Sequence, residues 1–187
     1  VICSSFKETW KVFTMPTMTL VVNDFVLPSG SDWAANTGAR DDAVATDDGN
    51  TSYISENTDG EEVTFLLADP SVDSRDIASI DSVQYFFKGR YASRSGTSAV
   101  KIAITGVPAS LSTETITVSS GLAYGTYSGS VFTTNSAGGA WTYTNLENMR
   151  LYLLKYVSVT SSIRITYMYA SVVYTAADNA IFFGHNF

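Results

Sequence analysis

Apolar and polar residues alternate along most of the chain with a period of two residues. This period places every second side chain on the same face of a strand, so it predicts β-strands with one buried and one exposed face. The predicted strands cover residues 19–27, 53–54, 61–68, 77–90, 98–105, 113–119, 124–133, 150–158 and 162–175. Gly, Ser, Asn and Asp residues separate the strands at a spacing of roughly ten residues, which is typical of an all-β domain.

Helical periodicity is confined to residues 144–149. There Thr144 is the predicted N-cap and Glu147 the third position of a capping box. Residues 28–51 have no regular period, and we expect an irregular segment anchored by Trp33. An irregular segment of this length inside a compact domain is usually a binding surface or an interface.

This succession of short strands predicts an all-β fold, an antiparallel β-sandwich that is jelly-roll-like, with extended N- and C-terminal arms. We divide the chain into an N-terminal arm (1–18), a β-sandwich domain (19–175) and an apolar C-terminal tail (176–187). Apolar side chains in the arms are costly to leave in water, so they dock either on this domain or on a neighbouring molecule. The candidate assembly contacts are Trp10, Phe13, Ile181, Phe182, Phe183 and Phe187.

The composition narrows the range of partners. Hydrophobic residues make up 45% and charged residues 16% of the chain, against about 25% charged in an average globular protein. The net charge of −7 argues against a nucleic-acid partner, which requires a basic face. No apolar run approaches the ~18 residues of a membrane span, so we expect no membrane partner either.

The chain has a single cysteine, Cys3, and a single histidine, His185. These counts exclude an intramolecular disulfide, a structural zinc site of the usual four Cys or His ligands and CxxC redox chemistry. A Ser-His-Asp or Cys-His mechanism would have to use His185, near the chain end, as its base. We therefore expect no enzyme, no catalytic residue and no cofactor.

The densest acidic segment runs from residue 41 to residue 51. Its Asp41-Asp42 pair and its Asp47-Asp48-Gly49 run offer the oxygen ligands that calcium prefers. The ligand order of an EF-hand loop is absent, so a solvated acidic turn is favoured over a metal site. A carboxylate pair for glycan cleavage remains a third, unlocated alternative.

Several landmarks in order resemble a known group of proteins. They are Trp33, Asp47-Asp48 with Thr51 to Ile54, the strand end Lys88-Gly89-Arg90, Ala140-Trp141-Thr142 and the strand 163–174. This order resembles small β-sandwich proteins of tailed-bacteriophage structural modules, across roughly residues 33–174. The resemblance implies a capsid decoration, cement or tail-associated protein in the virion, and in the host cytoplasm during assembly. Its implied partners are other copies of itself, as a trimer, and a major capsid or tail protein.

A carbohydrate-binding module or adhesin tip is the alternative. Sugar rings stack on exposed aromatic rings, and the candidates for such glycan contacts are Trp33 and Trp141, with Tyr124 and Tyr127 beside them. For each of these rings a core or cross-strand contact is favoured over a glycan contact. Arg164 is expected to pair with one of the aspartates.

Overall fold

The computed structural model describes residues 15–26, 33–92, 97–105, 114–119, 123–156 and 162–177. The strands are β1 (Thr17–Val26), β2 (Ala34–Ala35), β3 (Ile54–Glu56), β4 (Glu62–Leu67), β5 (Ile77–Tyr91), β6 (Thr97–Thr105), β7 (Glu114–Ser119), β8 (Gly125–Ser128), β9 (Arg150–Tyr156) and β10 (Ile163–Ala176). The helical segments in these ranges are α1 (Asp42–Ala45), the 3-10 turn η1 (Ser74–Asp76) and α2 (Tyr143–Glu147).

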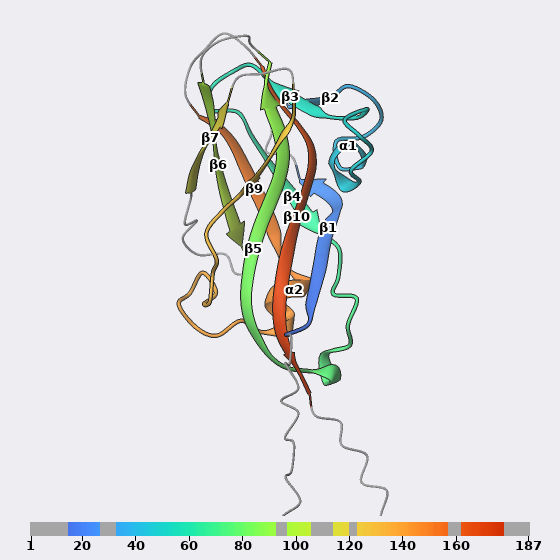
Figure 1. The fold of residues 1–187 in the computed structure, drawn as a ribbon, viewed down its shortest axis with the longest axis vertical. Coiled ribbons are helices and arrows are strands. Elements are labelled where there is room, and N and C mark those ends of the chain that lie inside the picture. Colours follow the sequence, from blue (N-terminus) through green and yellow to red (C-terminus); the bar gives the residue numbers. More distant parts are fainter. Residues whose placement is uncertain are drawn as a thin grey trace, which may run out of the picture.

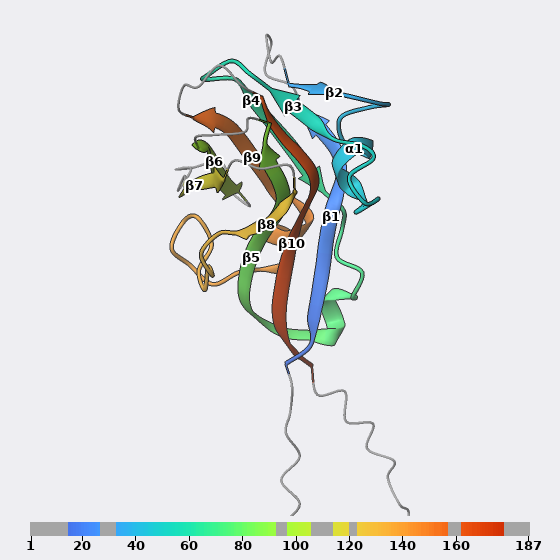
Figure 2. The same ribbon diagram turned by 45° about the horizontal axis from the view of Figure 1, so that its top comes forward.

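The strands form two antiparallel sheets (Figures 1 and 2). In the first sheet, here sheet A, β8 pairs with β5, β5 with β10, and β10 with both β3 and the first half of β1, while β2 pairs with β3. Sheet B continues from the second half of β1 through β4, β9 and β6 to β7. Strand β1 passes from one sheet to the other at a register shift between Val22 and Asp24. The fold is thus the predicted all-β, jelly-roll-like sandwich.

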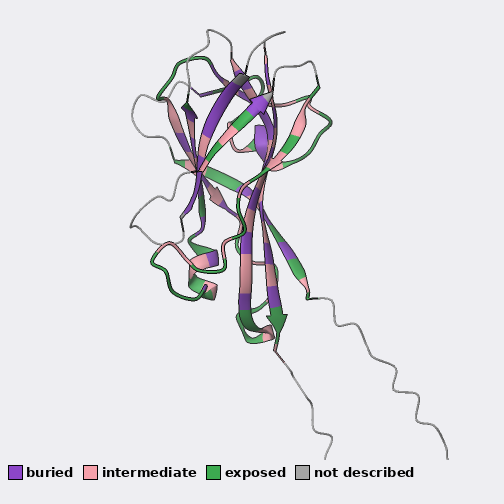
Figure 3. Ribbon diagram, turned by 60° about the vertical axis from the view of Figure 1, so that its left-hand side comes forward, coloured by how far each residue is buried: buried purple, intermediate pink, exposed green. Residues whose placement is uncertain are grey.

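The core lies between the two sheets and follows the alternation in the sequence. Buried residues alternate with more exposed ones along the long strands, as Figure 3 shows. The largest fully buried side chains are Trp33, Tyr85, Tyr91, Phe65, Phe87 and Lys155, followed by Leu20, Ile54, Ile102, Leu146, Met149 and Leu151. Because the side chains on one face of each sheet are removed from water, burial of apolar area is the main stabilising contribution, at about 25 cal/mol per Å².

Most predicted strands are present within two residues of their predicted bounds, but two local predictions were wrong. Helix α2 begins earlier than predicted, because Thr142 rather than Thr144 caps it. The Thr142 hydroxyl accepts a hydrogen bond from the Asn145 backbone at 3.2 Å, and the Asn145 side chain accepts one from the Thr142 backbone at 3.0 Å. The segment expected to be irregular contains β2 and α1, and α1 buries Ala43 and Val44 against β10 and β1.

Both ends of the described chain lie at one pole of the sandwich (Figure 1). Thr17 is opposite Val173, and the Tyr174 backbone N–H donates to the Pro16 carbonyl at 3.1 Å. The predicted assembly contacts Trp10, Phe13, Ile181, Phe182, Phe183 and Phe187 lie outside the described residues, as do Cys3 and His185. None of the helices in the described ranges has the length and apolar character to cross a membrane.

Candidate functional site

The outer face of sheet A carries a group of partly exposed aromatic and cationic side chains. The group consists of Tyr53, Phe86, Lys88, Arg90, Tyr124, Arg164, Tyr167 and Tyr169, and we refer to it as the aromatic-cationic face. Elsewhere on this sheet β1 begins with two outward threonines, Thr17 and Thr19. The face is therefore a local departure from the Ser- and Thr-rich surface.

The alternation of β5 and a bulge in β10 bring these side chains together. On β5, Phe86, Lys88 and Arg90 follow one another at every second position, on the face away from the core. On β10 the register shifts between Ile165 and Tyr167. This β-bulge adds one residue to β10, so Arg164 and Tyr167 point to the same face although they are three positions apart.

The aromatic part of the face is a stacked row. The rings of Phe86 and Tyr169 lie 4.9 Å apart at an interplanar angle of 7°, and those of Tyr167 and Tyr169 lie 5.0 Å apart at 31°. Burial raises the pKa of Tyr167, and the neighbouring Tyr169 and Asp47 add to the shift. Asp47 follows α1, and its carboxylate oxygen forms an ion pair with the Lys88 ammonium nitrogen at 2.8 Å beside this row.

The cationic part of the face is an arginine pair. Arg164 on β10 lies directly opposite Arg90 on β5. The Arg164 guanidinium lies over the Tyr53 ring at 4.6 Å, and that of Arg90 over the Tyr124 ring at 5.1 Å. The predicted Arg164–aspartate pair is wrong, because Arg164 contacts the Tyr53 ring and makes no ion pair with a described carboxylate.

The two tryptophans predicted as glycan contacts are core residues. Trp33 is 0% exposed, and its indole N–H donates to the Glu61 carbonyl at 3.0 Å. Trp141 is 6% exposed, and its indole N–H donates to the Phe132 carbonyl at 3.0 Å. Trp33 offers no face to a sugar, and Trp141 exposes only a small part of its ring to a cleft that it lines with Phe132, so both assignments are corrected in favour of the core alternative.

Tyr127 and Tyr124, the other two candidate glycan contacts, lie in different parts of the structure. Tyr127 stacks on Phe87 with ring centroids 5.0 Å apart and packs against the core. Tyr124 belongs to the aromatic-cationic face, where Arg90 covers its ring.

The acidic segment is organised as a hydrogen-bonded turn. The Asp48 carboxylate accepts from the Thr51 backbone at 2.9 Å, and from the Ser52 backbone at 2.9 Å and hydroxyl at 2.6 Å. The Ser52 hydroxyl and these backbone N–H groups hold the pKa of Asp48 below its ordinary value. Among the residues that the structure describes, no three His, Cys, Asp or Glu side chains gather as metal ligands.

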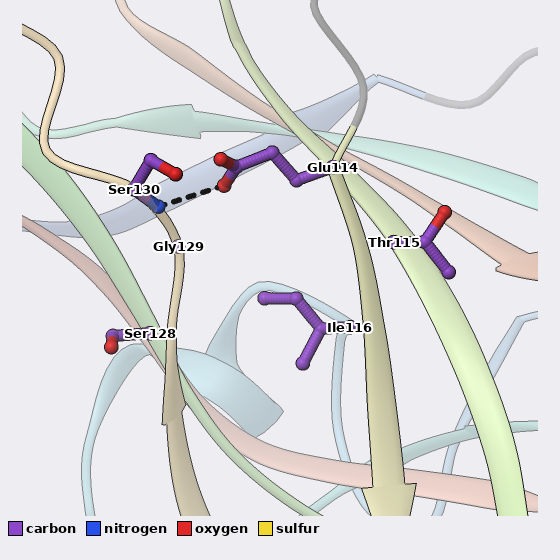
Figure 4. Close-up of a pocket in the computed structure, with 6 residues that line it drawn as sticks. All are labelled: Glu114, Thr115, Ile116, Ser128, Gly129 and Ser130. Atoms are coloured by element: carbon purple, nitrogen blue, oxygen red, sulfur yellow. Dashed lines mark hydrogen bonds between the residues drawn. The ribbon is translucent and has the colours of Figure 1, made fainter.

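A polar cleft of about 330 Å³ lies between β7 and β8, the edge strands of the two sheets (Figure 4). Glu114 crosses it and accepts from the Ser130 backbone at 2.8 Å and from the Tyr85 hydroxyl at 2.6 Å. Burial raises the pKa of Glu114, but the hydrogen bonds from Ser130 and Tyr85 outweigh burial and bring it below its ordinary value. One oxygen of this carboxylate accepts both hydrogen bonds, and the described lining offers no second carboxylate, so the cleft is interpreted as a structural contact.

Sequence reasoning missed Phe86, Arg90 and Tyr169. Their signal was present as aromatic and cationic residues at the outward positions of the predicted strands 77–90 and 162–175. What the sequence did not show was that these two strands are neighbours over their whole length.

No known family profile matches the sequence, and no curated protein matches it either. The fold is similar to several solved structures. The CBM22-1 xylan-binding domain from Paenibacillus barcinonensis Xyn10C is 10% identical, with 87% of this chain and 97% of that chain covered and a TM-score of 0.46. The CBM32 of AlyQ, in complex with 4,5-unsaturated mannuronic acid, is 21% identical, with 75% and 95% covered and a TM-score of 0.42. Tailspike protein 4 of bacteriophage CBA120 is 12% identical, with 87% and 19% covered and a TM-score of 0.37.

Proposed function

We propose that this chain is a glycan-binding β-sandwich domain and that the aromatic-cationic face is its binding surface. The observation that carries the proposal is the gathering of part-exposed aromatic rings and cations on one sheet face. Aromatic side chains offer apolar contact area to the C–H groups of a sugar, and tyrosine adds a hydroxyl for hydrogen bonding. The proposal keeps the carbohydrate-binding interpretation of the sequence and transfers it from the buried tryptophans to this face.

The dimensions of the face suit an extended ligand. Phe86 and Arg90 are four residues apart on β5, and a strand rises about 3.3 Å per residue, so the rows extend over about 13 Å. The stacked ring row crosses β5 and β10 at one end of this length, and the arginine pair crosses the same strands at the other. A ligand that contacts both rows must extend along the strands, which favours an oligosaccharide over a single sugar.

The double variant Phe86→Ala with Tyr169→Ala tests the proposal. Each aromatic contact contributes about 0.5–1.5 kcal/mol beyond its buried area, so we expect the affinity for the bound glycan to fall about 10- to 100-fold. A glycan array identifies the ligand, and titration calorimetry measures the loss. Tyr156→Ala is the matched control, because this ring is 43% exposed on sheet B beneath Lys101 at 3.8 Å.

Binding that is unchanged in the folded double variant contradicts the choice of this face. A wild-type chain that binds no glycan on the array contradicts the proposed function itself.

A second proposal concerns assembly: the domain is a phage virion protein of the capsid decoration, cement or tail-associated kind. The observation in its favour is that β1 begins beside the end of β10, so both arms join the sandwich at one pole. Apolar residues in both arms would then contact other copies, as a trimer, and a major capsid or tail protein. The residues of the aromatic-cationic face on β5 and β10 are paired away from that pole, so the two proposals are compatible.

Removal of residues 1–14 or 178–187 tests the assembly proposal and leaves β1 and β10 intact. We expect the full chain to sediment with intact virions and each truncated chain to be released. The measurement is immunoblotting of purified particles, with circular dichroism as the control for folding. The assembly proposal is contradicted if a chain that lacks both ends remains on the particles at wild-type occupancy.

A further inference from the structure

The ion pair between Asp47 and Lys88 lies beside the stacked ring row. The Lys88 ammonium nitrogen is 2.8 Å from an Asp47 carboxylate oxygen, and Lys88 is directly opposite Tyr167 across the β5–β10 pair. The Tyr167 ring in turn lies 5.0 Å from that of Tyr169. Burial, Tyr169 and Asp47 raise the pKa of Tyr167, in that order, so the Asp47 carboxylate is electrostatically close to this ring too.

Both members of the pair keep unused hydrogen-bonding capacity. Lys88 contacts only one of the two Asp47 carboxylate oxygens, and an ammonium has three N–H donors, of which Asp47 takes one. Neither side chain makes a further hydrogen bond or ion pair to a residue in the described ranges. The Asp47 side chain is 46% exposed and that of Lys88 is 22% exposed, so a ligand can reach both.

Stability gives little reason for this pair, because solvent-exposed ion pairs contribute little to it. The neighbouring helix α1 is already held by Ala43 and Val44, which are buried against β10 and β1. Asp47 is fixed between α1 and the hydrogen-bonded turn at Asp48, and Lys88 is fixed because β5 pairs with both β10 and β8. The pair is thus in place before a ligand arrives, which lowers the entropic cost of binding.

We infer that Asp47 and Lys88 together bind two adjacent hydroxyl groups of one sugar ring, as in a 1,4-linked glycan; this rests on the proposed glycan-binding function. One hydroxyl donates to the second Asp47 carboxylate oxygen, and its neighbour accepts from a Lys88 N–H. Such hydrogen bonds to ionised groups are about twice as strong as those between neutral groups. Because the two charges cancel, the pair presents a donor beside an acceptor, which matches two hydroxyls better than a carboxylate or a phosphate.

The test compares linkage isomers of the same sugar by titration calorimetry. The probes are the β-1,4- and β-1,3-linked hexasaccharides of glucose, with those of xylose as a second pair. Internal residues of the 1,4-linked chains have adjacent free hydroxyls at carbons 2 and 3, whereas those of the 1,3-linked chains have none. We expect the wild-type chain to bind the 1,4-linked form of at least one pair about 10-fold more tightly, the lower end of the range for hydrogen bonds to charged groups.

Variants of both side chains assign this preference to the ion pair. Asp47→Ala removes the acceptor, and Lys88→Met keeps the aliphatic stem without the donors, so each should reduce the ratio of the two affinities to about 1–3. The double variant should lose little more than either single variant, because the two side chains act as a unit. Each variant should keep its Tm within about 3 °C of wild type, since the pair is exposed.

Asp73→Asn is the matched control. Asp73 also forms an exposed ion pair, with Arg75 at 3.0 Å, and its side chain has the same 46% exposure as that of Asp47. It lies before η1 and β5, at the far end of that strand from Lys88. We therefore expect Asp73→Asn to leave both affinities and their ratio unchanged.

Equal affinity for the two linkage isomers of each pair, or a preference that survives in Asp47→Ala and Lys88→Met, overturns this inference. Binding to other glycans on the array without binding to any of the four probes overturns it as well. Each of these results leaves the proposed glycan-binding function standing. Absence of binding to every glycan on the array instead overturns the proposed function, and the inference with it.

Discussion

Replacement of Trp33 by alanine should lower the free energy of unfolding by about 3–5 kcal/mol, the usual cost of truncating a buried tryptophan. The ring is 0% exposed and its N–H is satisfied by the Glu61 carbonyl. Trp33 also accepts a hydrogen bond from Arg40 at its carbonyl, and the Arg40 guanidinium lies over the Phe25 ring at 5.5 Å. Since small domains are stable by about 5–15 kcal/mol, this loss is a large fraction of the total.

Urea unfolding followed by far-UV circular dichroism measures this effect. Trp33→Phe should lose less, because it keeps most of the apolar volume and gives up the hydrogen bond to Glu61. Val131→Ala, at a residue 55% exposed, should stay within about 0.5 kcal/mol of wild type. A Trp33→Ala chain with the wild-type midpoint would show that the ring is not part of the core.

The unfolding measurement on Trp33→Ala also decides how glycan-binding data on this variant are interpreted. Because the Trp33 ring is buried, a loss of glycan binding in Trp33→Ala would reflect the weakened core rather than a lost sugar contact. The aromatic-cationic face must therefore be tested through part-exposed residues such as Tyr169, whose truncation opens no core cavity.

The sequence predicted the strands well because their alternation is a local property. Strand β5 and strand β10 begin and end within one residue of the ranges 77–90 and 162–175. The burial of a lone tryptophan is not local. Trp33 lies in a segment without periodicity, so no alternation indicated which way its ring points. In the structure the ring is buried and its N–H bonds to the carbonyl of Glu61, the residue before β4.

The candidate site depended on strand pairing, which a single sequence does not contain. Arg90 and Arg164 lie far apart in the chain, and they meet only because β10 pairs with β5 in one register. A slip of one residue would turn one of them toward the core. The bulge that places Arg164 and Tyr167 on the same face breaks the period of two, so alternation alone could not identify it.

A different test concerns the contact between the edges of the two sheets, at Gly129. A Cβ on Gly129 would fall well inside contact distance of the Tyr85 ring and 2.5 Å from a Glu114 carboxylate oxygen. Neither side can give way easily, because Tyr85 is 1% exposed and its hydroxyl is bound to Glu114 at 2.6 Å. The Gly129 backbone is fixed as well, since its N–H donates to the Tyr85 carbonyl at 3.1 Å and its carbonyl accepts from Gln84 at 2.8 Å.

Gly129→Ala should therefore destabilise the protein by about 3 kcal/mol, at the upper end of overpacking effects, and lower its Tm by about 6–12 °C. Gly139→Ala is the matched control, because its nearest side-chain neighbour lies at an ordinary 3.6 Å, and it should stay within about 0.5 kcal/mol of wild type. Tyr85→Ala removes the obstructing ring, so Gly129→Ala should cost far less when added to that variant than when added to wild type. Equal unfolding midpoints for Gly129→Ala and Gly139→Ala would mean that β8 can move away from Tyr85, and that Glu114 does not hold the two sheet edges together.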